Sequence, residues 1–182
     1  MNRVRYFFAK AKHILSADSS KGFGVHSPFM FDFLQNLLNE KNPYYAYAEI
    51  DAIFKEKYDN KRAKFLYRLI NYYHIRRVGA LYISENDRKL LSICRDLEVL
   101  ECMAGSTGCD FDMVFLEAGE LSGVERSIEN NTILFISDIF DYNLLMDNFQ
   151  NSEKLKILVD FFDFSIIFAK PKFQKQSYKI KF

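Results

Sequence analysis

The sequence predicts an α/β protein in which a mostly parallel sheet with an antiparallel C-terminal edge follows an N-terminal helical extension. Beyond residue 75, short apolar runs alternate with helix-compatible segments, as they do where crossover helices join parallel strands. Before residue 75, apolar side chains recur at helical spacing. The 182 residues, 49% of them hydrophobic and 27% charged, suit one globular domain with a buried core. We therefore expect a helical extension over residues 1–74 and a sheet domain over residues 75–182.

The first expected helix, over residues 3–15, is basic and amphipathic. Its apolar side carries Phe7, Phe8, Ala11 and Leu15, and its basic residues are Arg3, Arg5, Lys10 and Lys12. Such a helix lies on a membrane surface, or it docks on its own domain or on a partner subunit. We expect docking, with the aromatic N-terminal helices as a candidate surface for a homo-oligomer, and we expect no membrane partner.

A second helix is predicted after the stretch "KGFGVHSPFMFDF" at residues 21–33. The two glycines permit a sharp turn, after which Ser27 can cap a helix that has Pro28 at its first position. His26 could act as a base or a ligand. No acid or cysteine lies at a spacing that would indicate a shared site, so we assign His26 a structural role. The apolar face of this helix comprises Phe29, Phe33, Leu37 and Leu38.

Further helices and the strands follow in order along the chain. Helices are predicted over residues 44–57, 61–73, 85–94 and 142–149, and strands over residues 78–83, 97–102, 111–116, 132–136, 155–159, 165–169 and 177–182. In the last strand, apolar residues alternate with Lys179 and Lys181, which is typical of a half-buried edge strand. The aromatic content of 16%, with 19 Phe and no Trp, predicts a phenylalanine-filled core.

The charge distribution bears on possible partners. The net charge of +1 gives no global field that would attract nucleic acid or a membrane. Acids dominate between Glu98 and Glu129, whereas the tail from Lys170 is basic and interleaves aromatic residues, a pattern that also suits single-stranded nucleic acid. Because the lysines alternate at strand spacing, we favour an edge strand and do not expect nucleic-acid binding.

The cysteines and the hydropathy pattern bear on location. Cys94, Cys102 and Cys109 lack CxxC spacing and are odd in number, which favours free thiols in a reducing compartment. No apolar run approaches the roughly 18 residues needed to cross a bilayer. We therefore expect a cytoplasmic protein.

Several blocks of the sequence carry a family resemblance. They are "GVHSPFMF" at residues 24–31, "YYAYAEID" at 44–51, "KFLYRLINYY" at 64–73, "FDMVFLEAGE" at 111–120, "ILFISDIF" at 133–140 and "VDFFDFSIIFAK" at 159–170. Together they resemble a bacterial family similar to class I S-adenosylmethionine (SAM)-dependent methyltransferases, whose members begin with a "GVHSPFVF" helix. The resemblance implies a Rossmann-like sheet with the cofactor at the carboxyl ends of its strands.

The chain departs from the family at the cofactor turn, where glycines let SAM lie against the backbone. After Gly79 this chain has bulky residues and no further glycine before the helix beyond Ser84. The resemblance also places Glu101 where an acid would bind the ribose hydroxyls, although a surface carboxylate explains this residue equally well. The candidate cofactor contacts are therefore Gly79, Ser84 and Glu101, beside a turn whose bulk should fill the ligand volume.

A second departure is a short connection at residues 103–110, where the family has a helix, a strand and another helix. A crossover alone needs about a dozen residues, so we expect a sheet that lacks about one strand and its helices. The "AGSTG" segment at residues 104–108 could cradle a phosphate, but no firm helix follows it. We interpret this segment as a short loop that bridges the deletion.

Glu117 and Asp138 end two predicted strands and are the candidate catalytic acids. The resemblance implies that they converge at the carboxyl edge of the sheet, where two carboxylates could hold Mg²⁺ weakly. Metal-dependent relatives carry a second aspartate and a histidine where this chain has Ser137 and Glu120. We therefore assign no metal site.

These features predict a methyltransferase-like protein with a degenerate SAM site that acts as a non-catalytic binding or assembly module. We expect no cofactor, or SAM if one binds. One alternative is an active SAM-dependent methyltransferase with a rebuilt pocket, using Glu101 for the ribose and Glu117 or Asp138 as base or metal ligand. The other alternative is a weak nucleic-acid-binding protein.

Overall fold

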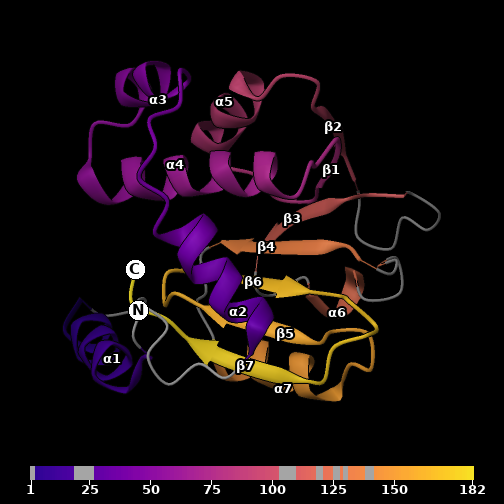
Figure 1. Cartoon of the computed structure of the whole chain (residues 1–182). Helices are drawn as coiled ribbons and strands as arrows, with labels where there is room; N and C mark the ends of the chain where they lie inside the picture. Colours follow the sequence, from indigo (N-terminus) through magenta and orange to yellow (C-terminus); the bar gives the residue numbers. More distant parts are fainter. Residues whose placement is uncertain are drawn as a thin grey trace.

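The computed structural model describes residues 3–18, 27–102, 110–117, 121–124, 128, 131–137 and 142–182. The strands are β1 (Arg77–Ala80), β2 (Glu98–Glu101), β3 (Met113–Glu117), β4 (Ile133–Ser137), β5 (Ile157–Asp160), β6 (Phe164–Phe168) and β7 (Gln176–Lys179). The helices are α1 (Arg3–Ser16), α2 (Pro28–Asp32), the π-helix η1 (Phe33–Leu38), α3 (Tyr47–Ile53), α4 (Lys57–Tyr72), α5 (Glu85–Ile93), α6 (Leu121–Val124) and α7 (Tyr142–Asn151). In this described part, seven strands form one sheet with helices on both faces (Figure 1). The expected α/β fold with a mostly parallel sheet is confirmed.

The strand order is β2-β1-β3-β4-β6-β5-β7, and the first four of these strands pair in parallel. β6 lies inside the sheet, antiparallel to both β4 and β5, whereas β7 pairs in parallel with β5 at the edge. The expectation of an antiparallel C-terminal edge is therefore wrong, because the reversed strand is internal. The turn at residues 161–163 reverses the chain between β5 and β6, and residues 169–175 reverse it again, so β7 runs alongside β5 in the same direction.

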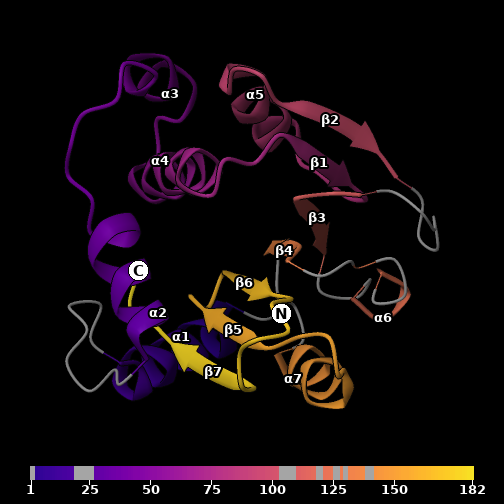
Figure 2. The same cartoon turned by 45° about the vertical axis from the view of Figure 1, so that its right-hand side comes forward.

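Each face of the sheet carries its own apolar core, because successive side chains of a strand point to opposite faces. Figure 2 shows α2, α4 and α5 on one side of the sheet and α6 and α7 on the other. The core under α2, η1, α4 and α5 is rich in buried phenylalanine and includes Phe33, Phe65, Phe115, Phe135, Phe164 and Phe168. On the other face, Leu121, Leu145 and Phe149 pack against the sheet. The expected phenylalanine-filled core is confirmed on the first face.

The N-terminal helices and the sheet share that first core. Phe33 of η1 packs edge-on against Phe168 of β6 with ring centroids 5.9 Å apart. Phe65 of α4 lies at the same centroid distance, 5.9 Å, from Phe164 of β6. Residues on both sides of the boundary expected at residue 74 thus belong to one continuous core.

The start of α2 follows the predicted capping pattern. Ser27 Oγ accepts a hydrogen bond from Met30 N at 3.4 Å, and Pro28 occupies the first position of the helix. The residues of the preceding turn that were singled out from the sequence, Gly22, Gly24 and His26, lie outside the described residues.

The sequence predicted that this helix continues to Leu38, but the π-helical form of its second part, η1, was not expected. Asn39 N donates to the carbonyl of Leu34 at 3.0 Å, the five-residue spacing of a π-helix. Arg68 of α4 is 8% exposed and donates to the carbonyls of Leu37 and Leu38 at 3.0 and 3.2 Å. A helix leaves its last carbonyls without partners inside the helix, so this buried guanidinium satisfies the end of η1 from a neighbouring helix.

Candidate functional site

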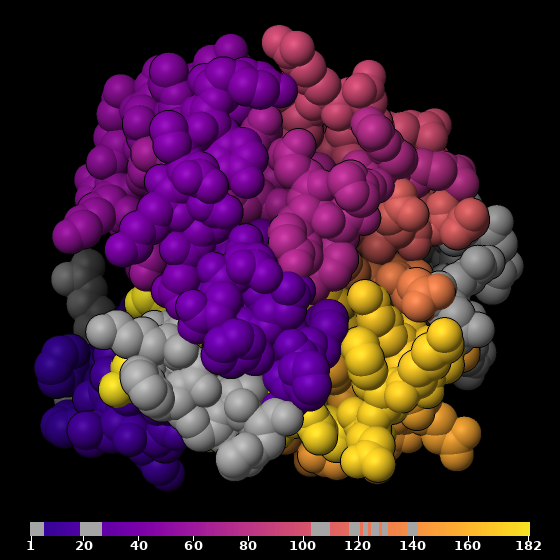
Figure 3. All heavy atoms as spheres, in the orientation of Figure 1, coloured from indigo at the N-terminus to yellow at the C-terminus, as the bar shows by residue number. Residues whose placement is uncertain are grey.

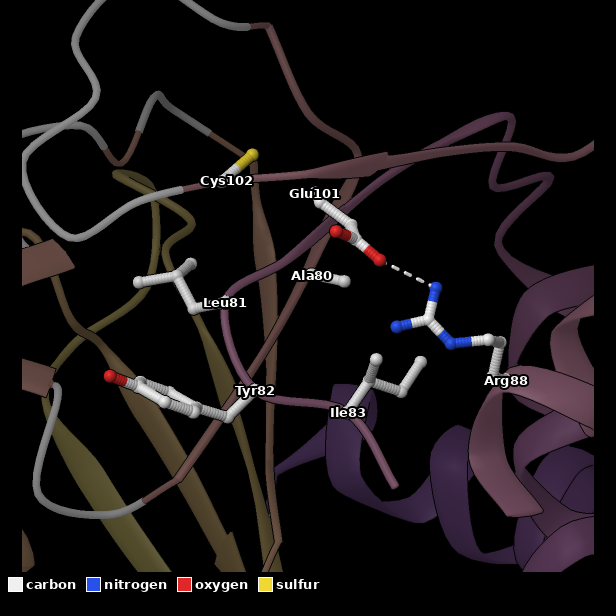
Figure 4. Close-up of a pocket in the computed structure, with 7 residues that line it drawn as sticks. All are labelled: Ala80, Leu81, Tyr82, Ile83, Arg88, Glu101 and Cys102. Atoms are coloured by element: carbon white, nitrogen blue, oxygen red, sulfur yellow. Dashed lines mark ion pairs between the residues drawn. The ribbon is translucent and has the colours of Figure 1, made fainter. Parts of the chain in front are cut away.

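A pocket of about 330 Å³ lies where β1 and β2 end (Figure 4). Ligands of open α/β sheets bind at this carboxyl edge of the parallel strands. The described residues that line the pocket are Ala80, Leu81, Tyr82, Ile83, Arg88, Glu101 and Cys102. Of the three candidate cofactor contacts, Glu101 is in this lining.

Glu101 is the last residue of β2, and its carboxylate forms an ion pair with the guanidinium of Arg88 in α5 at 2.7 Å. Figure 4 shows the two side chains pointing toward each other. The side chain of Arg88 is 51% exposed and that of Glu101 is 71% exposed. Water screens such a pair, so it contributes at most about 1 kcal/mol to stability. Glu101 therefore has an intramolecular partner that a ligand could displace at small cost.

Ser84 caps α5, and its hydroxyl both accepts and donates a hydrogen bond. Ser84 Oγ accepts from Asp87 N at 3.0 Å and donates to Asp87 Oδ2 at 2.9 Å. Asp87 is 2% exposed and accepts two further hydrogen bonds from Arg62 of α4, at 2.9 and 3.1 Å. This network closes the N-terminal turn of α5, and the single hydroxyl hydrogen of Ser84 is already committed to Asp87.

Gly79 is explained by packing inside the sheet. Its neighbour Val78 belongs to the core under α4, so Gly79 faces the opposite side of the sheet. A Cβ at residue 79 would lie 2.9 Å from two ring carbons of Phe111, a buried residue of the second core. Glycine is required here because the Phe111 ring lies against the backbone.

The turn after β1 carries the bulky residues that were expected to fill the ligand volume. Ile83 is half-buried and projects toward the Arg88–Glu101 pair, whereas Tyr82 is 47% exposed and turns away from it (Figure 4). Both residues line the pocket, and about 330 Å³ remains open beside them. The bulk of the turn shapes the pocket but does not abolish it.

The candidate catalytic acids follow β3 and β4, which end side by side. Residue 117 pairs with Ser137 in the sheet, so both strands reach the same edge. The side chain of Glu117 lies outside the described part of the structure, and so does Asp138. Among the side chains that are described, no group of three His, Cys, Asp or Glu residues could hold a metal ion. The roles assigned to Glu117 and Asp138 stay predictions.

Arg62, Asp87 and Arg88 belong to the site but were not predicted from the sequence. Arg88 follows the Ser84 cap by one helical turn, and its position at the start of the helix after β1 is a signal that could have identified it. Arg62 has no such signal, because it lies 25 residues before Asp87 on another helix.

The basic tail makes contacts within the chain. Lys175 Nζ donates to the carbonyl of Phe149 at 3.0 Å, near the C-terminal end of α7. Lys170 Nζ lies among four aromatic rings, with the Tyr73 centroid 5.1 Å away, and burial lowers its pKa. β7, which ends at Lys179, is an edge strand as expected.

Neither protein-family models nor curated proteins match the chain. In the part of the chain that the structure describes, no helix is both long and apolar enough to span a bilayer.

Proposed function

We propose that the chain is a methyltransferase-like protein with a degenerate SAM site, and that it acts as a non-catalytic binding or assembly module. One observation carries this proposal: each candidate cofactor contact already has a partner inside the chain. Ser84 is hydrogen-bonded to Asp87, Glu101 is paired with Arg88, and Gly79 lies against Phe111. The described residues therefore fit SAM poorly, and we derive no step of methyl transfer from them.

The strand order supports the methyltransferase-like ancestry. In a doubly wound sheet of order 3-2-1-4-5-6, strand 3 lies beyond strand 2. Here β2, β1, β3 and β4 follow the order 2-1-4-5, and β2 is the edge of the described sheet. Only residues 102–112 separate β2 from β3, the next strand that the structure describes. A loss of one strand beyond β2 would account for both facts and would remove a wall from the pocket.

Calorimetric titration with SAM and with S-adenosylhomocysteine tests the proposal. We expect no heat of binding from either compound at micromolar concentrations, because the Ser84 hydroxyl is already bonded to Asp87 and the Phe111 ring covers the backbone at Gly79. Micromolar affinity for either compound would overturn the degenerate-site proposal.

A second candidate function is an active methyltransferase with a rebuilt pocket. It is favoured by the pocket volume of about 330 Å³, which falls at the lower end of the roughly 300–1,000 Å³ of ligand sites. It is also favoured by the exposed Arg88–Glu101 pair, which costs little to open. This candidate predicts that Glu101→Ala weakens SAM binding by about tenfold, the effect of losing one charged hydrogen bond. The matched control is Glu98→Ala, an exposed acid at the other end of β2, which should leave binding unchanged.

A further inference from the structure

α1 contacts the rest of the protein through its polar side. The Tyr6 hydroxyl donates to Asp163 Oδ1, and Lys10 Nζ lies 2.6 Å from Asp163 Oδ2. His13 Nε2 lies 3.1 Å from Asp160 Oδ2 and is 7% exposed. Both partner residues, Asp160 and Asp163, are at or beside the turn between β5 and β6, where Phe162 also packs against the Tyr6 ring at 5.3 Å. The docked side of this helix is therefore polar.

The apolar side of α1 faces away from the protein. Phe7, Phe8 and Leu15 are 69%, 68% and 87% exposed, and Ile14 is 45% exposed. At 100° per residue these four positions fall within about a third of the helix circumference. They therefore form one outward apolar arc, and α1 lies at the lower left edge of the molecule in Figure 3.

The charge of α1 indicates what this arc could contact. The helix contains Arg3, Arg5, Lys10 and Lys12 and no acid. Lys10 is paired with Asp163, while Lys12 is exposed beside the apolar arc. Two copies packed through this helix would bring like charges together without acids to compensate them. A bilayer with anionic headgroups over its apolar acyl chains complements both the apolar arc and the positive charge of α1.

We propose that α1 binds the surface of an anionic phospholipid bilayer, with the arc of Phe7, Phe8, Ile14 and Leu15 inserted at the boundary between headgroups and acyl chains. Lys12, which is exposed beside the arc, then meets lipid phosphates, and the polar side of α1 holds the domain on the aqueous side of the bilayer. This arrangement lies on the membrane and does not cross it. It revises the expectation of no membrane partner and does not depend on the methyltransferase-like ancestry.

A tryptophan reporter provides the first test, because the chain contains no Trp. The Phe7→Trp variant is mixed with vesicles of two parts phosphatidylcholine to one part phosphatidylglycerol, and with vesicles of phosphatidylcholine alone. We expect a blue shift of the Trp emission with the anionic vesicles and a much smaller one with the neutral vesicles. Phe31→Trp is the matched control, since Phe31 is 52% exposed but lies on α2. It should show no shift.

Vesicle co-sedimentation of the full chain provides the second test. The double variant Phe7→Ser, Phe8→Ser should lower the partition coefficient by at least about 30-fold, because it removes two large apolar side chains from the bilayer. Lys12→Gln should lower it by about fivefold, and high salt should weaken binding further. Phe31→Ser should leave it unchanged. All four substituted side chains are exposed, so the folded domain should persist, and the far-UV circular dichroism spectrum checks this.

Three outcomes would overturn the proposal. They are equal binding of both vesicle types, a Phe7→Trp shift no larger than that of Phe31→Trp, and a concentration-dependent shift without vesicles. Analytical ultracentrifugation would follow up the last result. Dimers that the double variant abolishes would show that the arc binds a second copy of the chain instead.

Discussion

α4 and α1 are both amphipathic helices of the N-terminal region, yet they present opposite sides to the rest of the protein. In α4 the apolar stripe is inside, and Phe65, Leu66 and Leu69 are each 0% exposed. In α1 the polar side is inside, and its phenylalanines are exposed. Helical spacing of apolar residues thus identifies a helix without telling which of its sides the protein will cover.

The difference follows from what each helix meets. α4 packs on the sheet face, where the strands supply buried phenylalanine. α1 meets the turn between β5 and β6, where Asp160 and Asp163 supply carboxylates. A tyrosine and a lysine contact Asp163 and a histidine lies beside Asp160, whereas an apolar stripe would remove these polar neighbours from both carboxylates.

The largest expected effect belongs to the α4 side. Phe65→Ala should lower the free energy of unfolding by about 3–5 kcal/mol, because it leaves a cavity among packed aromatic rings. Urea denaturation followed by circular dichroism measures this. Phe7→Ala is the matched control on α1, and its effect should stay below about 0.5 kcal/mol. Similar losses for the two variants would abolish the distinction between the helices.

The next effect concerns the contact that holds α1. His13→Ala should lower the free energy of unfolding by about 1–3 kcal/mol, since it removes a buried partner of Asp160. The loss is limited because Asp160 Oδ1 still accepts from Phe162 N at 2.8 Å and from Ser165 Oγ at 3.4 Å. Hydrogen exchange should also quicken in α1. A loss no greater than that of the control Lys12→Ala would mean that α1 is not held through His13.

The pH dependence of stability tests how well water is excluded from the core that α4 shares with the sheet, which includes Cys94. Burial raises the pKa of the Cys94 thiol from 9.0 to about 12. Above pH 9 the unfolded chain releases this proton while the folded chain keeps it, so the contribution of Cys94 to stability is complete below pH 9 and falls as the pH rises toward 12. The slope is about 1 kcal/mol per pH unit.

Comparison with Cys94→Ala isolates this contribution from that of the tyrosines. We expect the wild type to lose stability faster than the variant between pH 9 and pH 12 in urea titrations. Parallel curves for the two proteins would show that water reaches the thiol.

A smaller effect is expected from the partly exposed pair beneath α1. Lys10 and Asp163 are 34% and 20% exposed, so Lys10→Ala should cost at most about 1 kcal/mol. The cost should shrink in high salt, because ions screen the pair. Thermal unfolding at two salt concentrations measures both quantities. An effect as large as that of His13→Ala would make Asp163, rather than Asp160, the main anchor of α1.

The smallest effect is expected at the outward arc. The double variant Phe7→Ser, Phe8→Ser should change the free energy of unfolding by less than about 0.5 kcal/mol, since neither ring packs into the core. The same variant should lose most of its vesicle binding. A clear loss of stability in urea would instead show that the arc is covered by the protein itself.

Local signals predicted most elements of the fold. The apolar runs identified the strands, and the Ser27 cap with Pro28 after it identified the start of α2. The internal position of β6 could not be predicted, because the partners of a strand depend on residues far away in the chain. The outward arc of α1 could not be predicted either, since it depends on carboxylates more than a hundred residues later.

The site was predictable in its position but not in its contacts. Glu101 was singled out through the family resemblance, and it does line the pocket at the end of β2. The residues that engage the candidate contacts lie elsewhere in the sequence: Arg62 is on α4, and Phe111 lies two residues before β3. Periodicity along one segment carries no information about such neighbours.

The shared aromatic core constrains how the chain folds during synthesis. Phe33 and Phe65, from the first helices, pack against Phe168 and Phe182, with ring centroids 5.9 and 5.7 Å apart. The ribosome synthesises those helices well before Phe168 and Phe182. Until then their apolar sides are exposed to solvent or bound by a chaperone. The first core should therefore be completed only after the segment through Phe182 has been synthesised, and a premature stop within β6 or β7 would leave an aggregation-prone fragment.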